Sequence, residues 1–108
     1  MSKSKKGGFK KMIYTVEEIK TRAIPVAQEY GVQSMSLFGS YARGDATEDS
    51  DVDFLIERGD IHDLLDYVGF INDLETVLDC HVDVVSTGIE DKSFLALIMK
   101  DRVVLYER

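Results

Sequence analysis

Apolar and polar residues follow two different periods along this chain, which predicts helices interleaved with strands. Segments with an apolar residue every three or four positions read as helices, and short alternating or continuous apolar runs read as strands. Helices are expected over residues 16–30, 41–43, 60–79 and 89–100, and strands over 33–38, 51–57, 80–86 and 102–106. This alternating order predicts an α/β (α+β) fold in which a mixed β-sheet is flanked by helices.

Local signals suggest where the longer helices begin and end. Thr15 and Glu18 have the spacing of a capping box, so they should start the first helix. Gly31 suits its end, and Pro25 inside it should kink it. Asp60 is expected to cap the long helix that follows the second strand.

The chain has 108 residues, which favours one folded domain. Residues 1–11 contain five lysines, two glycines and little apolar character, so we expect a disordered basic tail followed by one domain over 12–108. No apolar run approaches the roughly 18 residues of a membrane span, so no membrane partner is expected. The single Cys80 excludes an internal disulfide, which favours a cytoplasmic location.

Charge is concentrated in the middle of the chain. The net charge is −7, and residues 43–91 carry fifteen acidic side chains against two basic ones. Such a segment repels nucleic acid, which is therefore not expected as a direct substrate, and it attracts divalent cations or a basic protein. With one Cys and two His, any metal is expected to be held by oxygen ligands.

A glycine–serine turn forms the first candidate binding feature. Gly39 and Ser40 lie between a predicted strand and a predicted helix start, where backbone N–H groups are unpaired and favour anions. Ser40 adds a hydroxyl donor, and Arg43 adds a positive charge one turn later. Such turns are common, so this feature alone indicates phosphate binding only weakly.

Three aspartates form the second feature. Asp51 and Asp53 alternate along one strand and therefore share a face, and Asp83 lies within the strand predicted over 80–86. If the two strands are neighbours, all three carboxylates meet and supply the hard oxygen ligands that Mg²⁺ prefers. The valines around Asp83 predict a largely buried strand, in which an unpaired aspartate would be costly. The alternative for Asp83 is an exposed position on an edge strand. His81 shares the face of Asp83, where it either borders this site or has a structural role.

Together these features resemble a known superfamily. The run GSYARGDATEDSDVDFLI, followed by HVDVV, is similar to the motif of nucleotidyltransferases with the DNA polymerase β-like fold. The positions that fall on that motif are Gly39, Ser40, Gly44, Ser50, Asp51, Asp53 and Asp83. The resemblance is strongest to the minimal nucleotidyltransferases, or MNT proteins, and it extends over about residues 15–108. It implies the polymerase β-like fold.

The resemblance also implies an activity. Such a protein transfers NMP, here expected to be AMP from ATP, to a hydroxyl acceptor and releases pyrophosphate. Asp51, Asp53 and Asp83 would be the catalytic residues and would hold two Mg²⁺ ions. Gly39 and Ser40 would bind the leaving phosphates of the nucleotide, with the help of Arg43.

MNT proteins commonly act with a helical HEPN partner, which implies a role as antitoxin and a tyrosine of that toxin as acceptor. Three alternatives stay open at this point. In the first, the chain neutralises its toxin by contact alone, and in the second it modifies a small molecule in a pocket formed between subunits of an oligomer. The last alternative is a globular domain in which the carboxylate motif is incidental.

Overall fold

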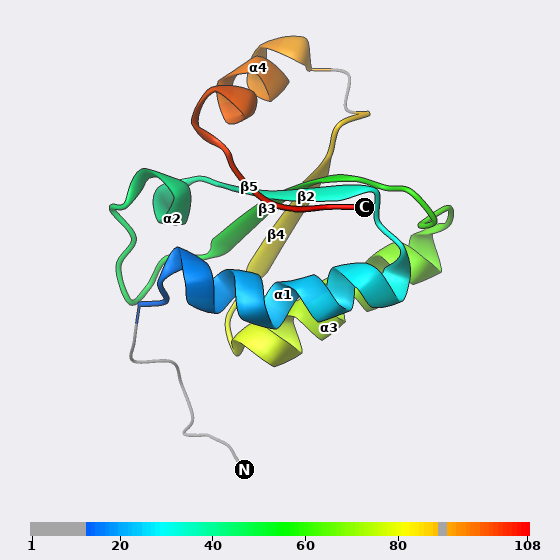
Figure 1. Ribbon diagram of the computed structural model, residues 1–108. Helices are drawn as coiled ribbons and strands as arrows, with labels where there is room; N and C mark the ends of the chain where they lie inside the picture. The colour runs from blue at the N-terminus through cyan, green and yellow to red at the C-terminus, as the bar shows by residue number, and fades with distance from the viewer. Residues whose placement is uncertain (1–12, 89–90) are drawn as a thin grey trace.

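The computed structural model describes residues 13–88 and 91–108, so the tail predicted at residues 1–11 lies outside the described residues. Helices and strands alternate in the predicted order (Figure 1). The elements are α1 (Val16–Tyr30), β2 (Ser34–Phe38), α2 (Ser40–Arg43), β3 (Val52–Glu57), α3 (Leu64–Leu78), β4 (Val82–Ser86), α4 (Lys92–Asp101) and β5 (Val103–Glu107).

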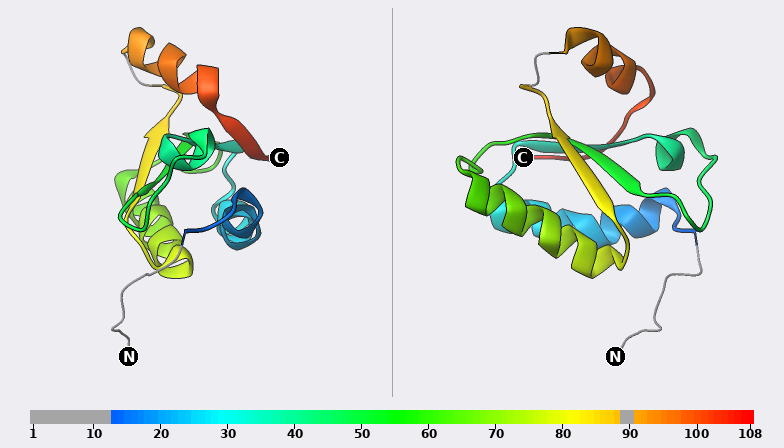
Figure 2. Two further views of the ribbon diagram at one scale, coloured as in Figure 1. Left: turned by 90° about the vertical axis from the view of Figure 1, so that its left-hand side faces the viewer. Right: turned by 180° about the vertical axis from the view of Figure 1, so that it is seen from behind.

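The strands form one mixed sheet in the order β4-β3-β2-β5, which confirms the predicted fold class. β3 and β4 run parallel, while β2 is antiparallel to both β3 and β5. A parallel pair needs a crossover connection, and α3 provides it. α1 and α3 cover one face of the sheet, and α4 stands over the other (Figures 1 and 2).

The hydrophobic core lies between the sheet and the α1–α3 layer. In β3, Val52, Phe54 and Ile56 are fully buried toward this layer, while Asp53 and Glu57 alternate onto the opposite face. The other fully buried core side chains are Ile19, Ala23, Ala27, Val32, Met35, Leu37, Phe70, Leu74 and Leu78. The acidic positions of β3 therefore face away from the core, on the side of α4.

The first helix begins and ends where its sequence signals place it. Thr15 and Glu18 form both bonds of the capping box, and Gly31 ends the helix with a φ of 69°. The helix continues through Pro25 to Tyr30.

The predicted cap of the long helix is wrong. α3 begins at Leu64, and Asp63 is its N-cap, accepting a 2.8 Å hydrogen bond from the backbone N–H of Asp66. Asp60 lies instead in the preceding turn, where the Arg108 guanidinium is 3.2 Å from its carboxylate. Arg108, at the far end of the chain, thus forms an ion pair with Asp60, the residue that the local sequence pattern indicated as the helix cap.

β4 is less buried than its valines suggest. It is an edge strand of the sheet, and within it only Val82 is buried. Asp83 is exposed, so it needs no partner to offset burial, and the expectation of a largely buried strand is wrong. The alternative position on an edge strand is the one observed.

α4 packs only loosely against the rest of the domain. It begins after its N-cap Asp91, and the start predicted at residue 89 lies outside the described residues. Ile98 is its buried residue, whereas Phe94, Leu97 and Met99 remain exposed. None of the described helices combines the length and the apolar character that crossing a bilayer requires.

Candidate active site

Strand pairing brings the predicted carboxylates to one place. The parallel register sets Asp53 directly beside Asp83, and Asp51 lies two residues earlier on the same face of the chain. On the other side of β3, the antiparallel register sets Phe38 opposite Asp53, so Gly39 follows beside it. The predicted meeting of the three aspartates is therefore a consequence of strand order and register.

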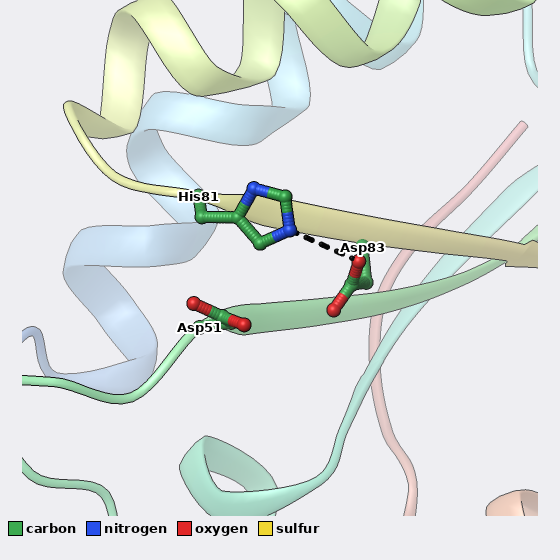
Figure 3. A group of neighbouring side chains, drawn as sticks. All are labelled: Asp51, His81 and Asp83. Atoms are coloured by element: carbon green, nitrogen blue, oxygen red, sulfur yellow. Dashed lines mark ion pairs between the residues drawn. The ribbon is translucent and has the colours of Figure 1, made fainter.

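A compact group of ligand atoms forms at the beginning of β3 and β4. One carboxylate oxygen each from Asp51 and Asp83 and one ring nitrogen of His81 all lie within 4.8 Å of one another (Figure 3). All three side chains are exposed and leave room for further ligands. The group includes an imidazole, which the sequence placed only at the border of the site, and the charge and spacing of its carboxylates fit a divalent cation.

Asp53 lies next to this group in a less exposed position. Its carboxyl is half-buried, and burial is the main cause that raises its pKa to about 6 from an ordinary value of 3.8. The charges of Asp83 and Asp51 and a hydrogen bond with Asp83 raise it further, against a smaller opposing effect of Arg43. A negative charge on Asp53 is thus disfavoured, and a cation bound nearby would relieve that cost.

His81 is held between two carboxylates. Its Nδ1 lies 3.2 Å from Oε2 of Glu75 in α3, and its Nε2 lies 3.3 Å from Oδ1 of Asp83. The Glu75 oxygen also accepts a 3.1 Å hydrogen bond from the backbone N–H of Val82. The Asp51 carboxylate, ahead of Asp83 and Glu75, raises the pKa of His81 against the opposing effect of burial.

Gly39 packs directly against Asp53. A Cβ atom added at Gly39 would lie 2.2 Å from Oδ2 of Asp53, and its φ of 75° is one that other residues rarely adopt. The sequence indicated a glycine here so that an anion can approach the backbone. The structure adds that any side chain would displace a site carboxylate.

Ser40 and Arg43 are the first and last residues of the short helix α2, directly after Gly39. The Arg43 side chain is exposed, and its Nε lies 3.5 Å from Oδ2 of Asp45. Arg43 and Gly39 also line a hollow of about 170 Å³ that Phe94 and other α4 residues border. The candidate phosphate-binding residues Gly39, Ser40 and Arg43 therefore lie together, and the carboxylate that Arg43 contacts is that of Asp45.

Comparison with known proteins places this arrangement in a family. The profile of the nucleotidyltransferase domain matches residues 16–105. A candidate protein adenylyltransferase of Methanocaldococcus jannaschii, MJ0435, is 39% identical over 82% of this chain and 90% of its own length. The protein adenylyltransferase MntA of Thermococcus cleftensis is 39% identical over 66% of this chain and 76% of its own. The chain belongs to the nucleotidyltransferase domain family and is a nucleotidyltransferase.

Solved structures narrow the class. The structure of a candidate minimal nucleotidyltransferase is 30% identical, with a TM-score of 0.69, over 83% of this chain and 95% of that one. A tri-AMPylated HEPN toxin of Shewanella oneidensis in complex with its MNT antitoxin gives a match at 19% identity and a TM-score of 0.66, over 85% of this chain and 72% of that one. The latter likeness shows the fold alone. Within its family the chain is a minimal nucleotidyltransferase.

Proposed function

We propose that this chain transfers AMP from ATP to a tyrosine hydroxyl of a HEPN-type toxin and thereby acts as its antitoxin. The observation that carries the proposal is the convergence of Asp51, Asp53 and Asp83 beside the Gly39–Ser40 turn. Relatives named protein adenylyltransferases and the fold shared with an MNT antitoxin bound to an AMPylated HEPN toxin support it.

In this proposal the three aspartates hold two Mg²⁺ ions and are the catalytic residues. Bound there, Mg²⁺ would supply charge neutralisation at the reacting phosphate and at the departing pyrophosphate. Asp51 and Asp53 would place the α-phosphate of ATP. Asp83, which is exposed and pairs with Asp53 across the two strands, would orient the attacking hydroxyl and accept its proton.

Gly39, Ser40 and Arg43 would bind the β- and γ-phosphates. The absence of a side chain at Gly39 leaves room for the Asp53 carboxylate, and phosphate oxygens would approach the backbone N–H groups that follow it at the start of α2. The Ser40 hydroxyl would donate to the phosphates, and Arg43 would exchange its exposed contact with Asp45 for a phosphate oxygen. Catalysis then consists mainly of positioning and charge neutralisation.

The acceptor would come from the partner protein. The carboxylates of Asp51 and Asp83 are exposed, so a tyrosine from a second protein would have access to them. The net charge of −7 favours association with a basic partner surface.

The decisive test compares the wild type with the double variant Asp51→Asn/Asp53→Asn. With labelled ATP, Mg²⁺ and a HEPN-type protein from the same genome, the wild type should label the partner on tyrosine. The double variant should lose more than 99% of this transfer while keeping its circular dichroism spectrum, because it loses metal-binding charge but little volume. Asp49→Asn, an exposed loop position next to the site, is the matched control and should transfer normally.

Two outcomes would contradict the proposal. Equal labelling by the double variant would show that the carboxylates are misassigned. A double variant that transfers nothing and still neutralises the toxin would favour an antitoxin that acts by contact alone.

A further inference from the structure

His81 has the surroundings of a metal ligand, although its residue type is unexpected in a site of aspartates. The residue directly precedes β4, and its carbonyl accepts a 3.1 Å hydrogen bond from the N–H of Val52 at the start of β3. This pairing places His81 beside Asp51, two residues before the Asp53–Asp83 pair. Figure 3 shows a ring nitrogen directed at Asp83, with Asp51 beside the ring on the neighbouring strand.

The ring is oriented from behind by a carboxylate. Glu75 lies 3.2 Å from Nδ1 and itself accepts a hydrogen bond from the Val82 N–H, so it is placed to accept a hydrogen bond from Nδ1 and to orient the ring. That leaves Nε2 directed at the site, 3.3 Å from Asp83. Histidines that bind metals commonly donate their second ring N–H to a carboxylate in this way.

The spacing of the donor atoms also suits one ion. Ligands bound at about 2.1 Å to the same cation lie about 3 to 4 Å apart. The donor atoms of Asp51, His81 and Asp83 are within 4.8 Å of one another, so a small contraction brings them to that spacing. Their exposure leaves the remaining coordination positions to water or to a phosphate oxygen.

We propose that Nε2 of His81 is a ligand of the cation held by Asp51 and Asp83, and that this position selects a transition ion such as Mn²⁺ or Co²⁺ over Mg²⁺. Imidazole nitrogen suits the softer transition ions, whereas Mg²⁺ prefers an all-oxygen shell. The inference rests on the proposed function in one respect, which is that Asp51 and Asp83 bind a cation in both. Of the two cation positions that the proposed function fills with Mg²⁺, this one would prefer a transition ion, and the other, which has no imidazole, would keep Mg²⁺.

Metal binding by the full chain tests this without measuring transfer. Because a proton competes with metal for imidazole, calorimetry at the mildly alkaline pH of 8 gives the affinities for Co²⁺ and for Mg²⁺. His81→Gln should weaken Co²⁺ binding at least tenfold and change Mg²⁺ binding less than threefold. Glu75→Gln should weaken Co²⁺ binding about tenfold, since the ring then loses its orienting partner. The exposed His62, away from this group, is the matched control, and His62→Gln should change neither affinity.

Spin-echo spectroscopy of bound Mn²⁺ gives a direct second readout. The wild type should show coupling to a ring nitrogen, and His81→Gln should lose it. If the wild type shows no nitrogen coupling, or if His81→Gln binds Co²⁺ and Mg²⁺ more tightly, His81 is a resident counter-charge that competes with metal, and the inference fails. A chain that binds Co²⁺ through His81 but transfers no AMP would refute the proposed function alone.

Discussion

Asp53 is the site residue whose surroundings most clearly disfavour a negative charge. Its pKa of about 6 in the folded chain, against an ordinary 3.8, means that the folded state retains a proton that the unfolded state has released. The metal-free protein must therefore lose stability as pH rises from about 4 to about 6. Above about pH 6 the free energy of unfolding no longer changes through Asp53, because this carboxyl is ionised in both the folded and the unfolded state.

Replacing Asp53 should remove this penalty. A shift of two pKa units corresponds to about 3 kcal/mol at most. Because the side chain is half-exposed, solvent screening reduces the expected effect to about 1 kcal/mol. In a metal chelator at pH 8, Asp53→Asn should therefore raise Tm by about 5 °C, and the gain should vanish near pH 4.

Added Mg²⁺ should reverse the order, because it stabilises the wild type more than the variant by linkage. Thermal unfolding followed by circular dichroism measures both effects. Parallel Tm curves for the two proteins across this pH range would contradict the raised pKa of Asp53.

Gly39 permits a second test at the same scale. Gly39→Ala forces a Cβ to 2.2 Å from the Asp53 carboxylate and also places alanine at a positive φ. Gly44 is the matched control, since its φ is 84° but an added Cβ would meet nothing within 4 Å. We expect Gly44→Ala to cost about 1 kcal/mol from the backbone alone, and Gly39→Ala to cost about 2 kcal/mol more.

Chemical denaturation measures both substitutions. In an Asp53→Ala background the clash disappears, so Gly39→Ala should then cost about 2 kcal/mol less than it does beside the native aspartate. If the two glycine variants are equally stable in the wild-type background, the contact between Gly39 and Asp53 is not as tight as described.

Single residues also show where sequence reasoning succeeds and where it stops. Alternation along a strand is enough to place Asp51 and Asp53 on one face, and the spacing of the motif supplies Asp83. The contact between His81 and Glu75 depends on how the end of α3 lies against β4, which local pattern does not encode. Asp63 rather than Asp60 caps α3, and Asp60 instead contacts Arg108 from the far end of the chain, which local pattern does not encode either.

At the scale of elements, the three longer helices differ in how they are attached. α1 and α3 are tied by a 2.8 Å hydrogen bond from the Tyr30 hydroxyl to Asp73 and by a 3.0 Å bond from Arg22 to the carbonyl of Val77. Each also buries at least three apolar side chains. α4 buries only Ile98. Helices attached by few buried contacts open at a lower free energy than the core.

This difference predicts unequal protection of backbone amides. In hydrogen exchange monitored by mass spectrometry, α4 should exchange at least a hundredfold faster than α1, α3 and the central strands β2 and β3. Since about 2.7 kcal/mol separates such rates, the gap lies well within the global stability of a small domain. Protection of α4 equal to that of α3 would show that it docks more firmly than its burial indicates.

Element types followed from periodicity, but strand burial did not. The valines of residues 82–85 have the composition of an inner strand, yet β4 lies at the edge of the sheet. Burial of a strand depends on its position in the sheet order, and that order is set by the crossover through α3 rather than by the strand's own residues. The sequence left the pairing of β4 with β3 as a condition, and the structure pairs these strands so that Asp53 lies beside Asp83.

At the scale of the whole molecule, one face of the sheet carries the core and the other carries the candidate site. The two sets of residues alternate within the same strands, as Val52 and Asp53 do in β3. The fold class was predictable because the helix–strand order of a chain this short allows few arrangements. The loose packing of α4 over the site face could not be predicted, since its sequence has the amphipathic pattern of a helix that packs firmly.

This division of the sheet has a consequence for how such a protein changes over generations. A substitution at an outward strand position alters reactivity or partner choice while the packing beneath it remains intact. Lineages can therefore vary the residues of the site face through single mutations that cost little folding free energy. A chain of 108 residues, with little stability to spare, gains adaptability from having its chemistry on the side that its core does not use.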